Sequence, residues 1–102
     1  MPSLAEMTDM IRAGMGGDSG LGKSLKFDLR GEGVIHIDGD RVTNEDDPAD
    51  LVISISKTDL EALGKGRLDP MTAVIKGRMR MSDMGLAMSL QPQMRALFSK
   101  LI

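Results

Sequence analysis

The sequence predicts an α+β domain in which helices cover one face of a mostly antiparallel sheet. Segments typical of strands alternate apolar and polar residues, so each strand has one apolar and one polar face. Segments typical of helices stand before, between and after these strands. A sheet whose strands have a single apolar face is covered on one side only, and such sheets are mostly antiparallel.

The first helix is predicted over residues 3–13. Ser3 fits the N-cap position, and Glu6, three residues further on, completes a capping box. The glycine-rich stretch 14–22 ends this helix. Its apolar stripe consists of Leu4, Met7, Ile11 and Met15.

Four short strands are predicted in the middle of the chain. The sequence GEG turns the chain between the first two, and Asp38-Gly39 is a strong signal for a tight turn after the second. The acidic sequence NEDDP then forms a loop before the fourth. The predicted strands lie in SLKFDLRG (24–31), VIHIDG (34–39), residues 40–43 and DLVISIS (50–56).

The rest of the chain is predicted to alternate short helices with one more strand. Polar N-caps or a proline in the first turn begin the helices, and Gly64 and Gly77 end the first two. The helices are 58–63 after Ser56, 70–76 after Asp69, 84–90 after Asp83, and a last stretch from Pro92. The strand is GRMRMS, residues 77–82, with Met79 and Met81 on one face.

Composition excludes several classes of function. The chain has no cysteine, so a disulfide, a thiolate zinc site and a cysteine nucleophile are excluded. Its net charge of −2 offers no basic excess for a nucleic acid. No apolar run reaches the ~20 residues of a membrane span, and the N-terminus lacks the apolar centre of a signal peptide. We therefore expect a single cytoplasmic domain over residues 1–102.

The sequence GDSGLGKS, residues 17–24, matches the pattern of a phosphate-binding P-loop. In a P-loop a strand leads in and a helix leads out, and the helix N-terminus holds the phosphates. Here a helix leads in and a strand leads out, so we expect a flexible turn and no nucleotide. The quartet GDSG also occurs around the nucleophile of chymotrypsin-like proteases, but that chemistry needs a histidine base. The one histidine, His36, is predicted to lie at the surface on the polar face of a strand.

No metal site or cofactor is predicted. One histidine and scattered carboxylates give no ligand spacing. The acidic run 45–47 could contact calcium, but a solvated loop is the simpler interpretation.

The methionines allow two interpretations. Met79, Met81, Met84 and Met88 cluster within 76–90, and Met71 and Met94 flank them. Methionine either fills a core that has only two aromatic residues, or lines an adaptable apolar cavity, since it is flexible and polarizable. Residues 84–102 are apolar on more than one side, which a helix packed on a sheet does not need. This additional apolar surface is expected to contact a partner chain, a membrane surface or a bound apolar ligand.

The segment GKGRLDPMTAVIKGRMRMSDMGLAMSLQ, residues 64–91, resembles the signature of the sterol carrier protein 2 (SCP2) domain family. The matching features are a Gly-basic-Leu, a proline after one residue, an alanine three residues further on, a Gly-basic-apolar strand and MGLAM. The sequences ADLVISISKTDLEAL and GKSLKFDL resemble neighbouring elements of the family, so the resemblance covers residues 22–91. One departure is MSDMG, which is a residue shorter than the usual turn before MGLAM.

The resemblance implies a five-stranded sheet with one crossover, helices on one face and an apolar tunnel between the two layers. It assigns 22–102 to the core of the domain, after an N-terminal helix and turn over 1–21. Members of the family bind and carry sterols, fatty acids or fatty acyl-CoA, and this domain has no catalytic residues. The resemblance therefore implies a lipid carrier that is not an enzyme, with at most transient membrane contact, as a monomer or weak dimer.

The lipid would lie against the apolar face of the sheet and the helices that cover it. The predicted lining residues are Phe27, Ile35, Ile53, Ile55, Met71, Val74, Ile75, Met79, Met81, Met84, Met88, Met94, Leu97 and Phe98. The alternative is an interaction module with a filled core, whose apolar C-terminal helix face packs against another protein or a second copy. A third hypothesis is an accessory domain that presents a lipid to an enzyme.

Overall fold

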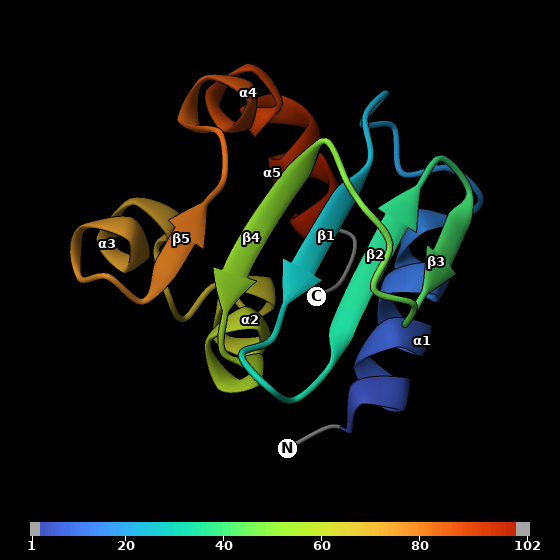
Figure 1. Cartoon of the computed structure of the whole chain (residues 1–102), viewed down its shortest axis with the longest axis horizontal. Helices are drawn as coiled ribbons and strands as arrows, with labels where there is room; N and C mark the ends of the chain where they lie inside the picture. The colour runs from blue at the N-terminus through green and yellow to red at the C-terminus, as the bar shows by residue number, and fades with distance from the viewer. Residues whose placement is uncertain (1–2, 100–102) are drawn as a thin grey trace.

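Five strands form one sheet with helices behind it (Figure 1), in a computed structural model that describes residues 3–99. The strands are β1 (Leu25–Asp28), β2 (Val34–Asp38), β3 (Arg41–Thr43), β4 (Leu51–Ile55) and β5 (Met79–Met81). The helices are α1 (Leu4–Met15), α2 (Lys57–Gly64), α3 (Pro70–Ile75), α4 (Met84–Ser89) and α5 (Gln91–Ser99). The predicted α+β class and the predicted order of elements are confirmed.

The strand order is β3-β2-β1-β4-β5. Neighbouring strands are antiparallel except β1 and β4, which are parallel. The chain leaves β1, forms β2 and β3 on one side, and returns as β4 on the other side of β1. This return is the single crossover expected for the sheet.

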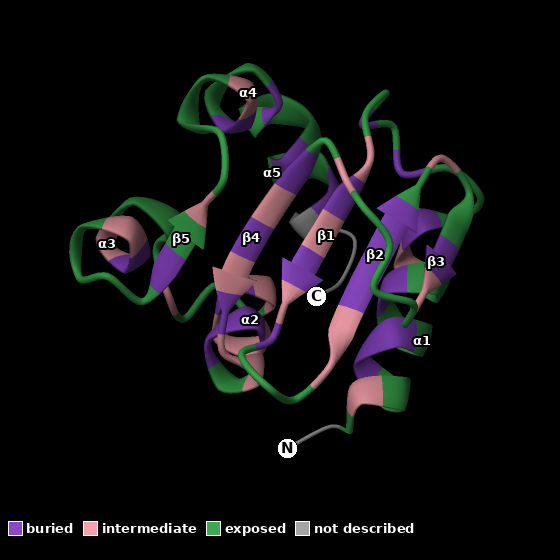
Figure 2. Ribbon diagram, viewed as in Figure 1, coloured by how far each residue is buried: buried purple, intermediate pink, exposed green. Residues whose placement is uncertain are grey.

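The strand register assembles a continuous apolar layer on one face of the sheet. Phe27 pairs with Ile35 on one side and with Ile53 on the other, and all three side chains are fully buried. The helices α1, α2 and α5 lie behind this face (Figures 1 and 2). The alternation of apolar and polar residues in the strands is therefore the direct cause of the two-layer arrangement.

Helix α1 is fixed to the β2–β3 side of the sheet. The Ser3 hydroxyl accepts from the Glu6 amide at 3.1 Å and the Ser3 amide donates to the Glu6 carboxylate, as the predicted capping box requires. The helix extends two residues beyond the predicted end and stops at Gly16, whose φ of 67° suits glycine. The Arg12 guanidinium then donates to the backbone carbonyl of Val42, in β3, at 2.6 Å.

The hairpin between β1 and β2 approaches α1 closely at Gly33. This glycine has a φ of 109°, and a Cβ there would lie 2.6 Å from a methyl carbon of Leu4. The turn predicted from the sequence GEG is therefore also a packing contact that only glycine fits.

Helix α2 is tied to the opposite edge of the sheet by an ion pair. The Arg78 guanidinium donates to both carboxylate oxygens of Asp59, at 3.0 and 3.3 Å. Arg78 precedes β5, and the Asp59 side chain is mostly buried. The two-pronged geometry orients β5 relative to α2 as well as attracting it.

The polar face of the sheet is covered in part by the segment between β3 and β4, which crosses in front of β2 (Figure 1). The ring Nε2 of His36 lies 3.0 Å from the Pro48 carbonyl oxygen, and Lys26 pairs with Asp46 at 2.7 Å. His36 is only 8% exposed. The prediction of a surface histidine was therefore wrong, because the acidic loop folds back over the strand that carries it.

The glycine-rich segment between α1 and β1 follows the predicted order, with a helix leading in and a strand leading out. Ser24 is used within the fold: its amide and its hydroxyl both contact the Asp50 carboxylate, at 3.0 and 3.1 Å. These hydrogen bonds, the one from the amide first, hold the pKa of Asp50 below its usual range.

Candidate functional site

The residues predicted to line a lipid site fall into three groups by exposure. Phe27, Ile35, Ile53, Ile55, Met79, Met94 and Leu97 are buried, and Val74 and Met81 are half-buried. Met71, Ile75, Met84 and Met88 are exposed, by 64%, 77%, 48% and 68%. Phe98 belongs to α5, but its side chain lies outside the described part of the structure.

The buried group comes together in one apolar core. Five of its members, Met79 of the edge strand β5 among them, lie on the sheet, and Met94 and Leu97 face the same core from α5. The inward orientation of Met94 and Leu97 also bears on the alternative hypothesis of a docking module. These two side chains are used inside the protein, so they present no apolar face to a partner.

The exposed group lies elsewhere. Met71 and Ile75 belong to α3, and Met84 and Met88 to α4, on either side of the edge strand β5 (Figure 1). Their predicted role as walls of a lipid cavity stays a prediction, since in this conformation their side chains lie at the surface.

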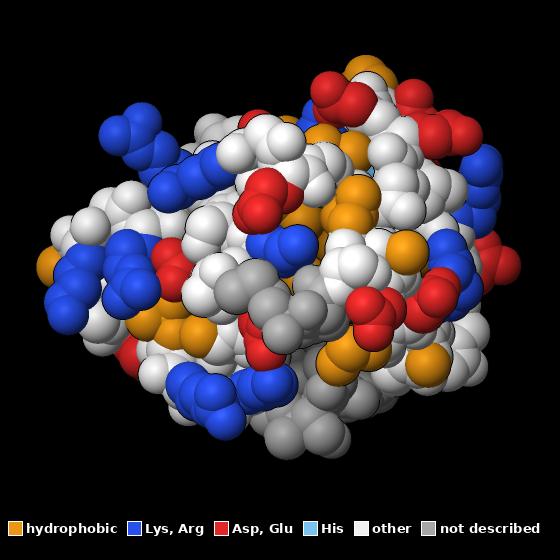
Figure 3. All heavy atoms as spheres, turned by 90° about the horizontal axis from the view of Figure 1, so that it is seen from below, with side chains coloured by type: hydrophobic (Ala, Val, Ile, Leu, Met, Phe, Trp, Pro, Cys, Tyr) orange, Lys and Arg blue, Asp and Glu red, His pale blue; other side chains and the backbone are white. Residues whose placement is uncertain are grey.

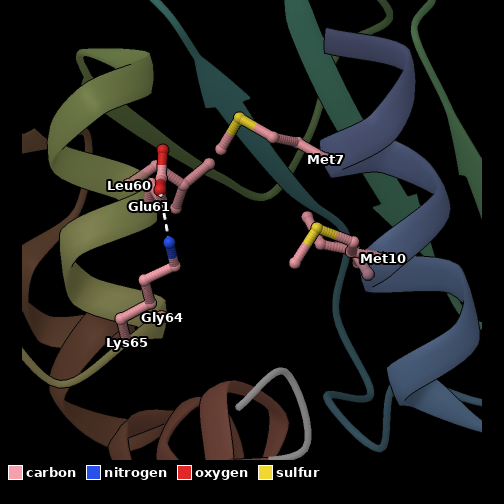
Figure 4. A pocket seen from close by; sticks show the side chains of 7 residues that line it. Met7, Met10, Leu60, Glu61, Gly64 and Lys65 are labelled. Carbon is pink, nitrogen blue, oxygen red and sulfur yellow. Dashed lines mark hydrogen bonds and ion pairs between the residues drawn. The ribbon is translucent and has the colours of Figure 1, made fainter. Parts of the chain in front are cut away.

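An apolar cleft lies between α1 and α2 (Figure 4). Met7 and Met10 extend from α1 toward α2, on which Leu60, Glu61 and Lys65 face them. Met7, Ile11 and Leu60 line the cleft and belong to the apolar core at the same time. The inner wall of the cleft is therefore part of the apolar core. Its lining residues are Met7, Met10, Ile11, Leu60, Glu61, Gly64 and Lys65.

None of these cleft residues was among the predicted lining residues, because the predicted site was carried by the C-terminal half of the chain. A signal for α1 was present in the sequence. Met10 lies off the stripe that Met7 and Ile11 continue, and it leaves an apolar side chain 46% exposed on an amphipathic helix. A large apolar residue beside the core-facing stripe indicates a second contact surface.

The rim of the cleft carries one ion pair. The Lys65 ammonium donates to a carboxylate oxygen of Glu61 at 2.6 Å, one helical turn away. This hydrogen bond lowers the pKa of Glu61. A cation beside an apolar opening can pair with an anionic head group whose tail enters the cleft.

The cleft is narrow in this conformation. It encloses about 40 Å³, whereas small-molecule sites in proteins span about 300–1,000 Å³. A lipid can therefore enter only if α1 and α2 move apart.

The two helices are attached to the sheet near opposite edges. Helix α1 is held by the Arg12 bond to β3 and by a 2.8 Å bond from the Asn44 amide to the Thr8 hydroxyl. Helix α2 is held at the other edge by the Asp59–Arg78 pair and packs against α5. None of these attachments joins α1 to α2.

Residues 3–99 contain neither a metal-ligand cluster nor a membrane-spanning helix. The described side chains include no group of three or more His, Cys, Asp or Glu residues that could hold a metal ion. No helix in this part of the chain is long and apolar enough to cross a membrane.

The fold and the cleft define a class: a small α+β domain with an apolar cleft between two of the helices that cover its sheet. The model of the SCP-2 sterol transfer family matches residues 18–95, which is well over half of the chain. The chain belongs to this family, as the resemblance of residues 64–91 implied.

Relatives of known name support the assignment. A stretch of 54 residues, 52% of this chain, is 43% identical to sterol carrier protein 2 of Gallus gallus. The same length is 41% identical to sterol carrier protein 2 of Bos taurus. The stretch covers 10% of each of these relatives, so the chain spans a small part of their length.

Solved structures show the same fold. Sterol carrier protein 2 of Yarrowia lipolytica, in its apo form, superposes with a TM-score of 0.70 at 16% identity, over 91% of this chain and 90% of that one. The sterol carrier protein domain 2 of Helicoverpa armigera superposes with a TM-score of 0.61 at 24% identity, over 92% of this chain and 76% of that one. At these identities the similarity is one of fold.

Proposed function

We propose that this domain binds a sterol, a fatty acid or a fatty acyl-CoA between its sheet and its helices and carries it without catalysing a reaction. The observation that supports this most is the apolar cleft between α1 and α2, whose walls are continuous with the core. Membership of the sterol transfer family makes a lipid the natural occupant.

The driving force is removal of apolar surface from water. Burial contributes about 0.8 kcal/mol per methylene, so a C18 chain gains on the order of 13 kcal/mol. Loss of translational and rotational freedom costs about 4–15 kcal/mol. At the lower end of this cost the remainder is about 9 kcal/mol, which corresponds to sub-micromolar binding of a fully enclosed chain. Methionines at positions 7 and 10 can adapt to different apolar shapes, because their side chains are unbranched.

The lipid would enter between α1 and α2 and lie on the sheet. The floor of the binding site would consist of Phe27, Ile35, Ile53 and Ile55, with Met79, Met94 and Leu97 at the end far from the entrance. Lys65 at the rim would pair with the head group of an anionic lipid in exchange for Glu61. A sterol has no anionic head, so Lys65 gives fatty acids an additional contact that sterols lack.

Fluorescence titration with cis-parinaric acid, a fatty acid, and dehydroergosterol, a sterol, tests this proposal. We expect saturable uptake of at least one probe, and displacement by the unlabelled lipid of the same class. Native mass spectrometry of the freshly purified protein adds a second readout, a discrete added mass that solvent extraction removes. A bare chain that takes up neither probe would contradict lipid binding.

A further inference from the structure

Large exposed apolar side chains gather at one end of the molecule. Met71 and Ile75 are four residues apart on α3, and Met84 and Met88 are four residues apart on α4. Residues at this spacing lie on the same face of a helix, so each helix turns one apolar ridge outward. Among the described residues, the one other large exposed apolar side chain is Met10, in the cleft.

The same end is positively charged. Residues 65–89 hold five Lys or Arg against two Asp, a net charge of +3, whereas the whole chain has −2. Figure 3 shows blue Lys and Arg side chains gathered at the left, where α3 and β5 lie, and most acidic side chains at the right. Electrostatic attraction to an anionic surface would therefore orient this end toward it.

Both acidic residues in the segment 65–89 cap helices at the surface. Asp69 and Asp83 are N-caps that accept from the backbone amides of α3 and α4, each at 3.0 Å. Of the cations, Lys65 and Arg78 are paired with acidic residues of α2. Within residues 3–99, Arg67, Lys76 and Arg80 have no carboxylate partner.

Two guanidinium groups, those of Arg30 and Arg80, line a polar hollow on the open face of the sheet near this end. It is lined by Arg30, Ser54, Gly77 and Arg80. Arg30 donates to the Ser54 hydroxyl at 3.3 Å and to the Arg78 carbonyl at 3.1 Å, which holds its side chain across β4. The carboxylate of Asp28 is also near, and accepts from the Arg30 amide. Two guanidinium groups in one hollow can donate hydrogen bonds to the oxygens of a phosphate group.

We propose that this end of the domain docks on the surface of a bilayer that contains anionic phospholipids. The outward ridges of α3 and α4 would enter the interfacial region, while Arg67, Lys76 and Arg80 contact head-group phosphates. A second copy of the chain is a poorer partner, because a symmetric contact would set two ends of +3 against each other. The proposal goes beyond the proposed function, since docking does not require a lipid in the cleft.

Cosedimentation with vesicles tests the proposal. The full chain is mixed with vesicles of phosphatidylcholine alone or of phosphatidylcholine with phosphatidylglycerol. We expect binding that requires phosphatidylglycerol and weakens with salt, because each Lys or Arg near an anionic surface contributes about a fivefold gain in partitioning. Arg80→Glu should therefore lower partitioning by about tenfold or more. The double variant Met71→Asp, Met88→Asp should abolish sedimentation.

Two matched variants serve as controls. Arg41→Glu makes the same charge change on β3, at the far edge of the sheet, and Met10→Asp makes the same apolar-to-acidic change on α1. Both should sediment with anionic vesicles nearly as the unmodified chain does. Equal losses in these controls, or no binding of the unmodified chain to anionic vesicles, would overturn the proposal.

Separate measurements distinguish the remaining outcomes. Far-UV circular dichroism shows whether a variant is folded, and uptake of cis-parinaric acid or dehydroergosterol without vesicles shows whether the cleft of the unmodified chain binds lipid. Docking of the unmodified chain without uptake of either probe would refute the proposed function alone, and uptake without docking would refute this inference alone. Sedimentation equilibrium of the free protein tests for a dimer, and a dimer that Met88→Asp dissociates would show that the ridges serve a second copy instead.

Discussion

Replacing Met10 with aspartate is the sharpest perturbation of the proposed lipid cleft. Met10 extends from α1 toward α2 and is 46% exposed in this conformation. The fold should tolerate the change. A partly exposed helix position loses at most about 0.7 kcal/mol of helix propensity on going to aspartate.

The effect on lipid binding should be much larger than the effect on folding. Full burial of a methionine side chain is worth about 1.5–3 kcal/mol, and a lipid in the cleft would complete the burial that Met10 lacks. An unpartnered carboxylate against the lipid adds a desolvation cost of about 1–3 kcal/mol or more. A loss of about 3 kcal/mol corresponds to roughly a 150-fold weaker Kd.

The assay is titration of cis-parinaric acid and dehydroergosterol into the unmodified chain, Met10→Asp and Met88→Asp. Met88 makes a matched control, since it is an exposed methionine on α4, away from the cleft. We expect the Kd to rise in Met10→Asp and to stay within about twofold in Met88→Asp. The reverse result would refute the cleft as the site and would support the sequence-based prediction that Met88 lines it.

Three further predictions follow from particular contacts. Glu61→Gln frees Lys65 for an anionic head group. Titration should therefore show about two- to fivefold tighter binding of cis-parinaric acid and unchanged binding of dehydroergosterol. Equal changes for both probes would contradict a head-group role of Lys65. Ile53→Ala removes a fully buried side chain from the interior strand β4, and urea unfolding should show that the free energy of unfolding falls by about 2–5 kcal/mol. A loss below about 1 kcal/mol would contradict the place of Ile53 in the core. The hydrogen bonds from Ser24 lower the pKa of Asp50 in the folded state. The ionised Asp50 carboxylate therefore stabilises the fold above about pH 4, its ordinary range in the unfolded chain. This stabilisation is lost as the pH falls through the lower pKa of the folded state. Thermal unfolding at successive pH values should therefore show a smaller acid-induced loss in Asp50→Asn than in the unmodified chain, and identical pH profiles would contradict this.

Much of the sheet could be predicted because its strands obey a local rule. Leu51, Ile53 and Ile55 alternate with half-buried residues, and the structure buries all three. The signals for the helix starts are equally local, because Ser3, Asp69 and Asp83 each cap the helix that was predicted to follow them. Signals of this kind act within a few residues of the chain, so they survive without knowledge of the tertiary structure.

Other features depend on segments that are distant in sequence. His36 is covered because Pro48 and its neighbours fold back over β2, and no local pattern around His36 encodes that contact. The cleft joins α1 to α2, whose facing residues Met10 and Leu60 are far apart in the chain. The methionines drew attention to α3 and α4, but the structure places those side chains outside the core. An apolar side chain in the sequence indicates that the residue makes a contact, but the tertiary structure determines which residue or ligand it contacts.

The most direct test of the central claim is an NMR titration with ¹³C-methyl methionine. The methionines are distributed over the cleft, the core and the α3–α4 end, so their methyl signals report on each region separately. On addition of a fatty acid or a sterol in the absence of vesicles, we expect the methyl signals of Met7 and Met10 to shift first and most. Shifts confined to Met71, Met84 and Met88, with Met7 and Met10 unchanged, would contradict a lipid site between α1 and α2.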